Sequence, residues 1–203
     1  MKEYYESGKL KSEQTFENGK LEGASKAYYE NGNLQGEVIF KNGRIEGTVK
    51  GYYESGKLQS EGTVKNDKQD GSEKDYYEDG KLQIEKTFKN GKQQGVMKTY
   101  NENGNLQKEE NFKNGKLEGV SKTYFENGNL QTDITFKNDK QEGALKAYYE
   151  NGNLQGEATF KNGKAEGWVR LYTEDGKYDS KVYCVNGIQY KSKKEYEDSL
   201  KDE

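Results

Sequence analysis

The sequence predicts an all-β fold: an elongated, single-layer antiparallel β-meander of 24-residue hairpin repeats, with a short C-terminal helix or tail. Three observations predict it. The tyrosine pair Tyr4-Tyr5 recurs every 24 residues, turn-forming dipeptides occur twice in each repeat, and proline is absent. Repeats of this length are typical of stacked supersecondary units. The absence of proline suits continuous β-ladders, because proline cannot donate a ladder hydrogen bond.

Each repeat contains two turn signals separated by segments of strand length. In the repeat YYENGNLQGEVIFKNGRIEGTVKG (residues 28–51) the signals are Asn31-Gly32 and Asn42-Gly43. Asn-Gly favours a two-residue type I′ turn, because both central residues need a positive φ. Asn66-Asp67 and Asn138-Asp139 lack the glycine and are expected to form weaker turns. The segments between turns alternate between about nine and about eleven residues, which predicts roughly sixteen strands in an open sheet rather than a closed barrel.

Two-residue turns would determine which residues lie opposite each other. Side chains alternate along a strand, so one face is expected to be apolar or small and the other to carry tyrosines and opposite charges. The pairs expected across Asn31-Gly32 are Tyr29–Leu34, Ala27–Gly36, Ser25–Val38 and Gly23–Phe40 on the first face, and Tyr28–Gln35, Lys26–Glu37 and Glu22–Lys41 on the second. Across Asn42-Gly43, Phe40 is expected opposite Ile45, and Val38 opposite Gly47. Because the alternating segments differ by two residues, the register either shifts in each repeat or a bulge absorbs the difference.

The domain organisation follows from where the repeat changes. Residues 1–190 are expected to form an eight-unit hairpin array, and residues 191–203 a charged helix or tail. The last unit is atypical, with Trp168, Tyr178 and Cys184 in place of the usual residues, which is expected of a terminal capping repeat. Ser192 followed by Glu195 resembles a capping box and predicts a short helix from about Lys193.

Composition excludes several classes of function. Hydrophobic residues make up only 29% of the chain and charged residues 34%, which is thin for a packed core, but the apolar positions recur in register and so favour order. A net charge of −3 with interleaved signs argues against nucleic acid as a partner, and no stretch is long and apolar enough for a membrane span. Histidine is absent, which excludes Ser-His-Asp triads and histidine metal sites. We therefore expect no enzyme and no cofactor.

Three features that resemble active-site motifs have simpler explanations. The glycines have hairpin spacing rather than the strand–loop–helix context of a nucleotide loop. The recurring carboxylates Glu13, Glu37, Glu61 and Glu85 are each expected opposite a basic residue, so no pair resembles that of a glycosidase. The turn Asn and Asp residues tolerate left-handed backbone and need no calcium. Cys184 cannot form an internal disulfide and is expected to be a buried hydrophobe.

The unit YYENGNLQGEVIFKNGRIEG resembles the variant MORN repeat of bacterial proteins in its tyrosine pair, its E-N-G turn, the following leucine and F-K-N-G-K-x-E-G. The resemblance covers about Tyr4 to Asn186 and implies extended antiparallel hairpins and a role in protein association or scaffolding. Bacterial relatives are often labelled antitoxins or surface-acting factors. A lipid-kinase label attached to some MORN proteins does not fit, because this chain has neither a phosphate-binding glycine loop nor a kinase catalytic Asp motif.

The preferred interpretation is a non-catalytic scaffold that binds another protein through its tyrosine-rich apolar face. Two ridges of large residues are expected there, with Gly, Ala, Ser, Thr and Val between them. The candidate contact residues are Tyr29, Leu34, Phe40, Tyr53, Leu58, Tyr77, Leu82, Phe125, Leu130, Tyr149 and Leu154. Self-association, through this face or through the open first strand, is an equally physical alternative. Two others are an antitoxin-like inhibitor of a toxin and a surface or secreted factor that binds host or glycan ligands.

The compartment is left open. The chain as given fits the cytoplasm, whereas an upstream signal segment would make it secreted or surface-exposed.

Overall fold

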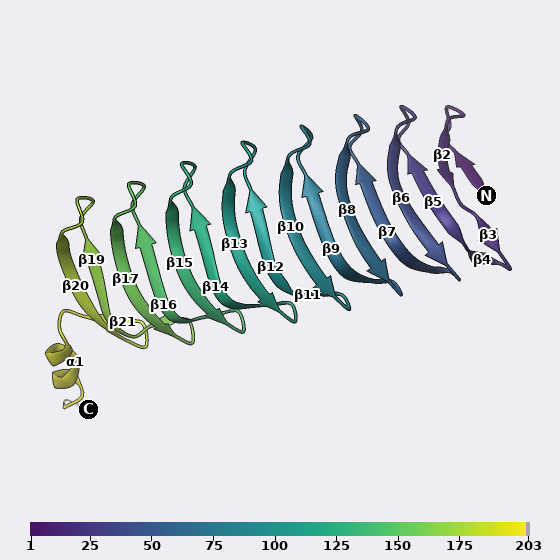
Figure 1. The fold of residues 1–203 in the computed structure, drawn as a ribbon. Helices are drawn as coiled ribbons and strands as arrows, with labels where there is room; N and C mark the ends of the chain where they lie inside the picture. The colour runs from purple at the N-terminus through teal and green to yellow at the C-terminus, as the bar shows by residue number, and fades with distance from the viewer. Residues whose placement is uncertain (202–203) are drawn as a thin grey trace. The chain divides into compact units, whose positions relative to one another are not determined.

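The computed structural model describes residues 1–201, which contain 21 β-strands and one α-helix. The chain divides into two compact units, Met1–Gly104 and Asn105–Glu203. Within each unit the strands pair antiparallel with their neighbours along the chain, so each unit is a meander of hairpins in a single layer (Figure 1). The exception is the short hairpin of residues 16–21, which pairs only within itself while the strands on either side of it pair with each other. The predicted all-β hairpin repeat is therefore confirmed. More than sixteen strands are present because irregular residues split several of the predicted ones.

In the first unit, three-residue loops and two-residue turns alternate between the strands. Its strands are β1 (Lys2–Tyr4), β2 (Leu10–Glu13), β3 (Phe16–Glu17), β4 (Lys20–Leu21), β5 (Gly23–Tyr28), β6 (Leu34–Lys41), β7 (Arg44–Tyr52), β8 (Leu58–Lys65), β9 (Lys68–Tyr76), β10 (Leu82–Lys89), β11 (Lys92–Gln93) and β12 (Gly95–Tyr100).

The second unit continues the same pattern and ends in the helix. Its elements are β13 (Leu106–Lys113), β14 (Lys116–Tyr124), β15 (Leu130–Lys137), β16 (Lys140–Tyr148), β17 (Leu154–Lys161), β18 (Lys164–Ala165), β19 (Gly167–Tyr172), β20 (Tyr178–Val185), β21 (Ile188–Tyr190) and α1 (Lys193–Ser199).

The two Asn-Gly signals of a repeat form different turns. Asn42 and Gly43 both have positive φ, 52° and 79°, and Lys41 lies opposite Arg44, so the predicted two-residue turn is confirmed here. At Asn31-Gly32 only the glycine has a positive φ, 96°. The Tyr29 N–H donates to the Asn33 carbonyl (2.8 Å), which closes a three-residue loop ending in a bulge.

That longer loop changes the pairing beside it. Leu34 lies opposite Tyr28, so the predicted pairs Tyr29–Leu34 and Tyr28–Gln35 are wrong. Farther along the strands the loop has no effect. The confirmed pairs there are Gly23–Phe40, Ser25–Val38, Lys26–Glu37 and Ala27–Gly36.

A bulge absorbs the difference in strand length beside the turns at Asn42-Gly43, Asn66-Asp67, Asn114-Gly115 and Asn138-Asp139. Phe40 lies opposite Ile45 as predicted, but Val38 lies opposite Val49 and not Gly47. Gly47 has a φ of 113°, which L side chains rarely adopt, so the bulge needs glycine at this position. The bulge alternative to a register shift is thus confirmed.

The turns that lack glycine keep the same geometry. Asn66 and Asp67 both have positive φ, and so do Asn138 and Asp139. The Asp67 carboxylate also accepts a hydrogen bond from the Ile45 N–H (2.7 Å). Aspartate therefore supplies an acceptor that glycine lacks, which offsets the cost of a left-handed non-glycine residue.

The helix begins where the capping box predicts. The Glu195 N–H donates to the Ser192 hydroxyl (3.1 Å), and the Lys191 N–H donates to the Glu195 carboxylate (2.5 Å). The Tyr196 ring packs at 5.2 Å from that of Tyr190, so α1 lies against the last strand (Figure 1). The predicted tail also includes residues 202–203, which lie outside the described part of the chain.

The single layer contains almost no conventional core. Among residues 1–201, Cys184 is the one buried hydrophobic side chain, 1% exposed, and it lies opposite Gly167 in the atypical last unit. In the same unit the Trp168 and Tyr183 rings are 5.1 Å apart, and the Lys181 ammonium lies over Trp168. Stability elsewhere comes from contacts between successive hairpins.

Candidate functional site

The candidate contact residues are half-buried side chains that recur once in each hairpin. Every one is partly exposed, and none is fully exposed or fully buried: Tyr29, Leu34, Phe40, Tyr53, Leu58, Tyr77, Leu82, Phe125, Leu130, Tyr149 and Leu154. The structure places the tyrosine and leucine positions at the two ends of the three-residue loops. Phe40 lies near the far end of β6, about 20 Å along the strand from Leu34 at ~3.4 Å per residue.

The second tyrosine of each pair bonds to the backbone of the next hairpin. The Tyr29 hydroxyl donates to the Tyr52 carbonyl at 2.8 Å. The equivalent bonds are Tyr5 to Tyr28, Tyr53 to Tyr76, Tyr77 to Tyr100 and Tyr149 to Tyr172. These rings therefore help to hold successive hairpins together, and Phe125 at the same position has no hydroxyl to donate.

In four repeats the first tyrosine position, occupied by Tyr28, Tyr76, Tyr100 and Tyr172, bonds to a carboxylate on the preceding hairpin. The Tyr28 hydroxyl donates to Glu13 (2.7 Å) and that of Tyr76 to Glu61 (2.8 Å). The hydrogen bond to Glu13, with burial, raises the pKa of Tyr28 to about 12. Burial, with the bond to Glu61, raises the pKa of Tyr76 to about 12. The bond from Tyr28 lowers the pKa of Glu13.

Charged side chains interrupt the part of the apolar face that was expected to hold only small or aliphatic residues. Lys86, 21% exposed, lies opposite Glu73 with an ion pair of 2.8 Å and is 3.6 Å from Asp75. Burial alone would lower the pKa of Lys86, but the two carboxylates outweigh it and raise this pKa. In the second unit, Lys108 pairs with the buried carboxylate of Glu110 at 2.8 Å. The expectation of an uncharged strip is wrong at these positions.

A third set of contacts was missed by sequence reasoning. The Glu46 carboxylate accepts from the Asn66 N–H at 2.8 Å, in the turn of the next hairpin. Equivalent bonds are Glu22 to Asn42, Asp70 to Asn90, Glu118 to Asn138, Glu142 to Asn162 and Glu166 to Asn186. The register of these strands ends at Gly23–Phe40, so the pair Glu22–Lys41 stays a prediction. The constant spacing of 20 residues between carboxylate and asparagine was the available signal.

At the three-residue loops, asparagine side chains make the matching contact. Asn31 and Asn33 both donate to the Glu54 carbonyl, each at 2.8 Å. Both ends of a hairpin are thus bonded to the next one.

Between Met1 and Lys201, no three His, Cys, Asp or Glu side chains are grouped so as to hold a metal ion. The hollows of the surface are open and lie between side chains of neighbouring hairpins. None of the helical segments described has the length and apolar character needed to cross a membrane.

Comparison with known proteins identifies the repeat. The family model described as "MORN repeat variant" matches seven segments: residues 1–18, 21–42, 45–66, 69–90, 93–114, 117–138 and 141–162. No curated protein matches. A solved structure of alternansucrase in complex with isomaltononaose is similar at 17% identity and a TM-score of 0.23, over 96% of this chain and 16% of that one. At that TM-score the likeness carries no argument about fold or function.

Proposed function

Because this chain belongs to the MORN repeat variant family and consists of hairpins in a single layer, we propose that it is a non-catalytic scaffold that binds another protein. Its contacts lie at the half-buried tyrosine and leucine positions of successive hairpins.

The observation that carries the proposal is the repetition of large, half-buried side chains in a sheet without a second layer. Tyr53 and Leu58, which flank one loop, have counterparts in the neighbouring hairpins, and each remains partly exposed. A row of such side chains exposes a larger continuous apolar area than the isolated apolar residues that are normal on the surface of soluble proteins. Tyrosine also suits interfaces, because its ring offers a large, stiff contact area.

The charged cluster adds a requirement for the partner. Lys86, Glu73 and Asp75 form their ion pairs within the strip and are about four-fifths buried. A partner that covers them must offer polar groups at this point, because ions sealed under an apolar surface would lose their remaining water. The cluster would thus select among partners that match the apolar residues equally well.

Photo-crosslinking in the native host cells tests the proposal. A photoreactive residue at Leu58 should capture one protein repeatedly, whereas the same residue at exposed Gln59, its neighbour in β8, should not. Tyr53→Ala with Leu58→Ala should abolish recovery of that protein. Tyr53→Phe, which keeps the ring and loses only the hydroxyl bond to Tyr76, should retain it. Equal capture from both positions, or unchanged recovery by the double variant, would contradict this surface.

The identity of the captured protein separates the narrower versions of the proposal. An antitoxin-like inhibitor would capture a protein whose release arrests growth when this chain is deleted. A surface factor for host or glycan ligands would capture no protein from these cells, and would instead bind a host protein or a glycan array through Leu58.

A further inference from the structure

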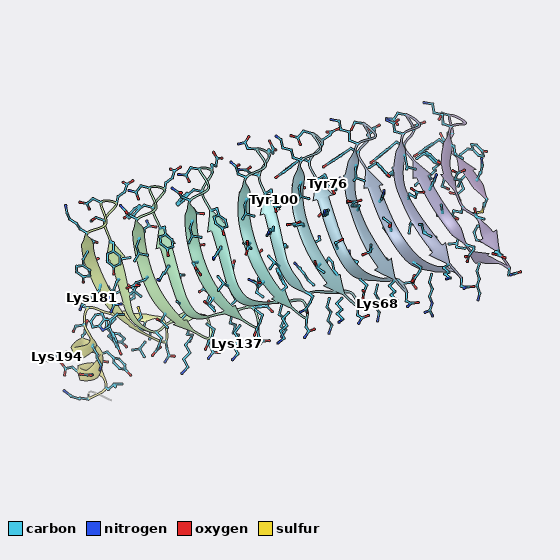
Figure 2. The ribbon with its side chains drawn as sticks, viewed as in Figure 1. Lys68, Tyr76, Tyr100, Lys137, Lys181 and Lys194 are labelled. Atoms are coloured by element: carbon cyan, nitrogen blue, oxygen red, sulfur yellow. The ribbon has the colours of Figure 1, made fainter. Side chains whose placement is uncertain are left out.

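The two-residue turns carry opposed pairs of cations at one end of the hairpins. In the first unit, Lys41 lies opposite Arg44, Lys65 opposite Lys68 and Lys89 opposite Lys92. The corresponding pairs of the second unit are Lys113–Lys116, Lys137–Lys140 and Lys161–Lys164. All of these side chains are exposed, and Lys68 and Lys137 project from the ends of their hairpins in Figure 2.

These cations are not neutralised by ion pairs within the part of the chain that the structure describes. Like charges directly opposite each other across a ladder destabilise a hairpin. The Glu46 and Asp70 carboxylates, which accept from turn N–H groups, offset only part of this charge, because the cations around them outnumber them. The arrangement therefore weakens the isolated chain and favours an anion from outside.

Hollows lie between consecutive turns at this basic end. One of about 610 Å³ is lined by Arg44, Lys65, Lys68 and Lys89, with Asp70. The next, of about 480 Å³, is lined by Lys20, Lys41 and Arg44, with Glu46. Each hollow can admit a carboxylate side chain between cations of two hairpins.

The opposite end of the hairpins is acidic at the three-residue loops. Each loop carries an exposed glutamate whose carboxylate makes no ion pair among the described residues. These are Glu6, Glu30, Glu54, Glu78 and Glu102 in the first unit and Glu126, Glu150 and Glu174 in the second. Lysine follows the glycine in some loops, and Lys81 pairs with Asp79 there at 3.0 Å. In the loops without such a lysine, including those of Glu126 and Glu150, no lysine follows the glycine to offset the negative charge of the glutamate.

We propose that the basic hairpin ends of one copy dock against the acidic loops of a second copy of this chain, with the glutamates entering the hollows between turns. The acidic loops and the basic hollows lie at opposite ends of the same hairpins. Both therefore repeat within a unit at about 10 Å, twice the ~4.8 Å strand spacing. When one glutamate of a copy occupies a hollow, the glutamates of the adjacent loops therefore lie opposite the adjacent hollows.

A second copy fits this edge better than a linear polyanion does. A copy turned basic end to acidic end brings opposite charges together, and its acidic loops repeat at the same spacing as the hollows, whereas a free polyanion has no fixed spacing that matches them. Single exposed ion pairs contribute little. Several acting at once give useful avidity. The contact is head-to-tail, so it can continue from copy to copy.

Sedimentation velocity of the full chain tests the proposal. Association is expected at about 0.01 M ionic strength and should disappear at about 1 M, where the Debye length falls from about 30 Å to about 3 Å. Lys65→Glu with Lys68→Glu should weaken association about tenfold or more, because attraction becomes repulsion, and so should Glu54→Lys with Glu78→Lys. A mixture of the two double variants should associate again, since each supplies the charge that the other lost.

The matched control reverses two exposed lysines that belong to neither a two-residue turn nor a three-residue loop, Lys191→Glu with Lys194→Glu, and should associate like the original chain. Circular dichroism shows that each variant keeps its β-structure. The salt dependence of the unmodified chain is a separate test that needs no variant. A monomer at low salt, association insensitive to salt, or no recovery in the mixture would each overturn the proposal. So would binding of sodium polyphosphate to monomers through Lys65 and Lys68 in preference to a second copy.

Discussion

The carboxylate of Glu46 accepts a hydrogen bond from the backbone N–H of Asn66, 2.8 Å away in the turn of the next hairpin. Glu46 lies in the bulge beside Gly47, and the two extra residues of that bulge direct its side chain along the sheet instead of across it. Bulges commonly re-aim a side chain in this way. The irregularity that absorbs the strand mismatch thus also joins one hairpin to its neighbour.

Removing this carboxylate should destabilise the sheet. Glu46→Ala is expected to lower the free energy of unfolding by about 1 kcal/mol, because the Asn66 N–H loses a charged acceptor at a site that water can partly satisfy. Urea denaturation followed by circular dichroism measures the change. Glu54→Ala is the control: that carboxylate is exposed and makes no ion pair or hydrogen bond among the described residues, so its effect should stay within about 0.5 kcal/mol. Equal effects of the two changes would contradict the role of Glu46.

The bulge glycine should be required for its backbone conformation. A Cβ at Gly47 would meet only ordinary contacts, 3.8 Å from Ile39, but its φ of 113° is strained for alanine. Gly47→Ala is therefore expected to cost about 1–3 kcal/mol. Gly62→Ala is the matched control, because Gly62 has no positive φ and its Cβ would meet the flexible Glu73 side chain at 3.4 Å. Urea midpoints compare the two, and a tolerated Gly47→Ala would show that the backbone relaxes.

The hydrogen bonds that tyrosine hydroxyls make between hairpins can be tested by removing one hydroxyl and by adding another. Tyr53→Phe removes the bond to the Tyr76 carbonyl (2.7 Å) and should cost about 1 kcal/mol. Phe125→Tyr adds a hydroxyl at the equivalent position of a later hairpin and should stabilise by a similar amount. Thermal or urea unfolding measures both. Opposite signs are the diagnostic result, whereas destabilisation by both changes would show that these rings act through packing alone.

The sequence was sufficient for the strand order and for part of the register. Phe40–Ile45 follows directly from alternation beside the two-residue turn at Asn42-Gly43. Lys26–Glu37 is predicted across Asn31-Gly32 and holds because the loop bulge lies between this pair and the loop. The same dipeptide at Asn31-Gly32 forms a longer loop, in which the Asn31 side chain accepts from the Asn33 N–H at 2.8 Å. Asn-Gly is compatible with both the two-residue turn and the three-residue loop. The hydrogen bond from the Asn33 N–H to the Asn31 side chain is what distinguishes the longer loop.

The candidate surface could be predicted less completely. The half-buried positions of Tyr29 and Leu34 follow from periodicity, but the hydroxyl bond from Tyr29 to Tyr52 depends on how far one hairpin is displaced from the next. A pattern of apolar residues carries no information on that displacement. The ion pair of Lys86 with Glu73 is different, because it has the register predicted for Ser25–Val38 two repeats earlier, so the residue types of that repeat are enough to predict it.

The raised pKa of Tyr28 predicts a loss of stability at high pH. Its pKa moves from about 10 to about 12, chiefly through its bond to Glu13, so the folded chain holds this proton more tightly than the unfolded chain does. A raised folded-state pKa stabilises fully below about pH 10, and that contribution is lost as pH rises from about 10 through about 12. The difference in urea midpoint between the original chain and Tyr28→Phe should narrow over this range. Glu13→Gln, which removes the acceptor charge, should shift tyrosinate absorbance to lower pH, and an unchanged titration would contradict the assignment.

Cys184 should be an unreactive thiol for as long as the last hairpins stay folded. It is 1% exposed, and burial, together with the charge of Glu166, raises its pKa. Since the thiolate is the reactive form, alkylation by iodoacetamide at neutral pH should be about a hundredfold slower in the folded chain than in urea. Mass spectrometry of the modified peptide measures both rates. A folded-state rate close to that in urea would mean that β20 opens readily or that Cys184 lies at the surface.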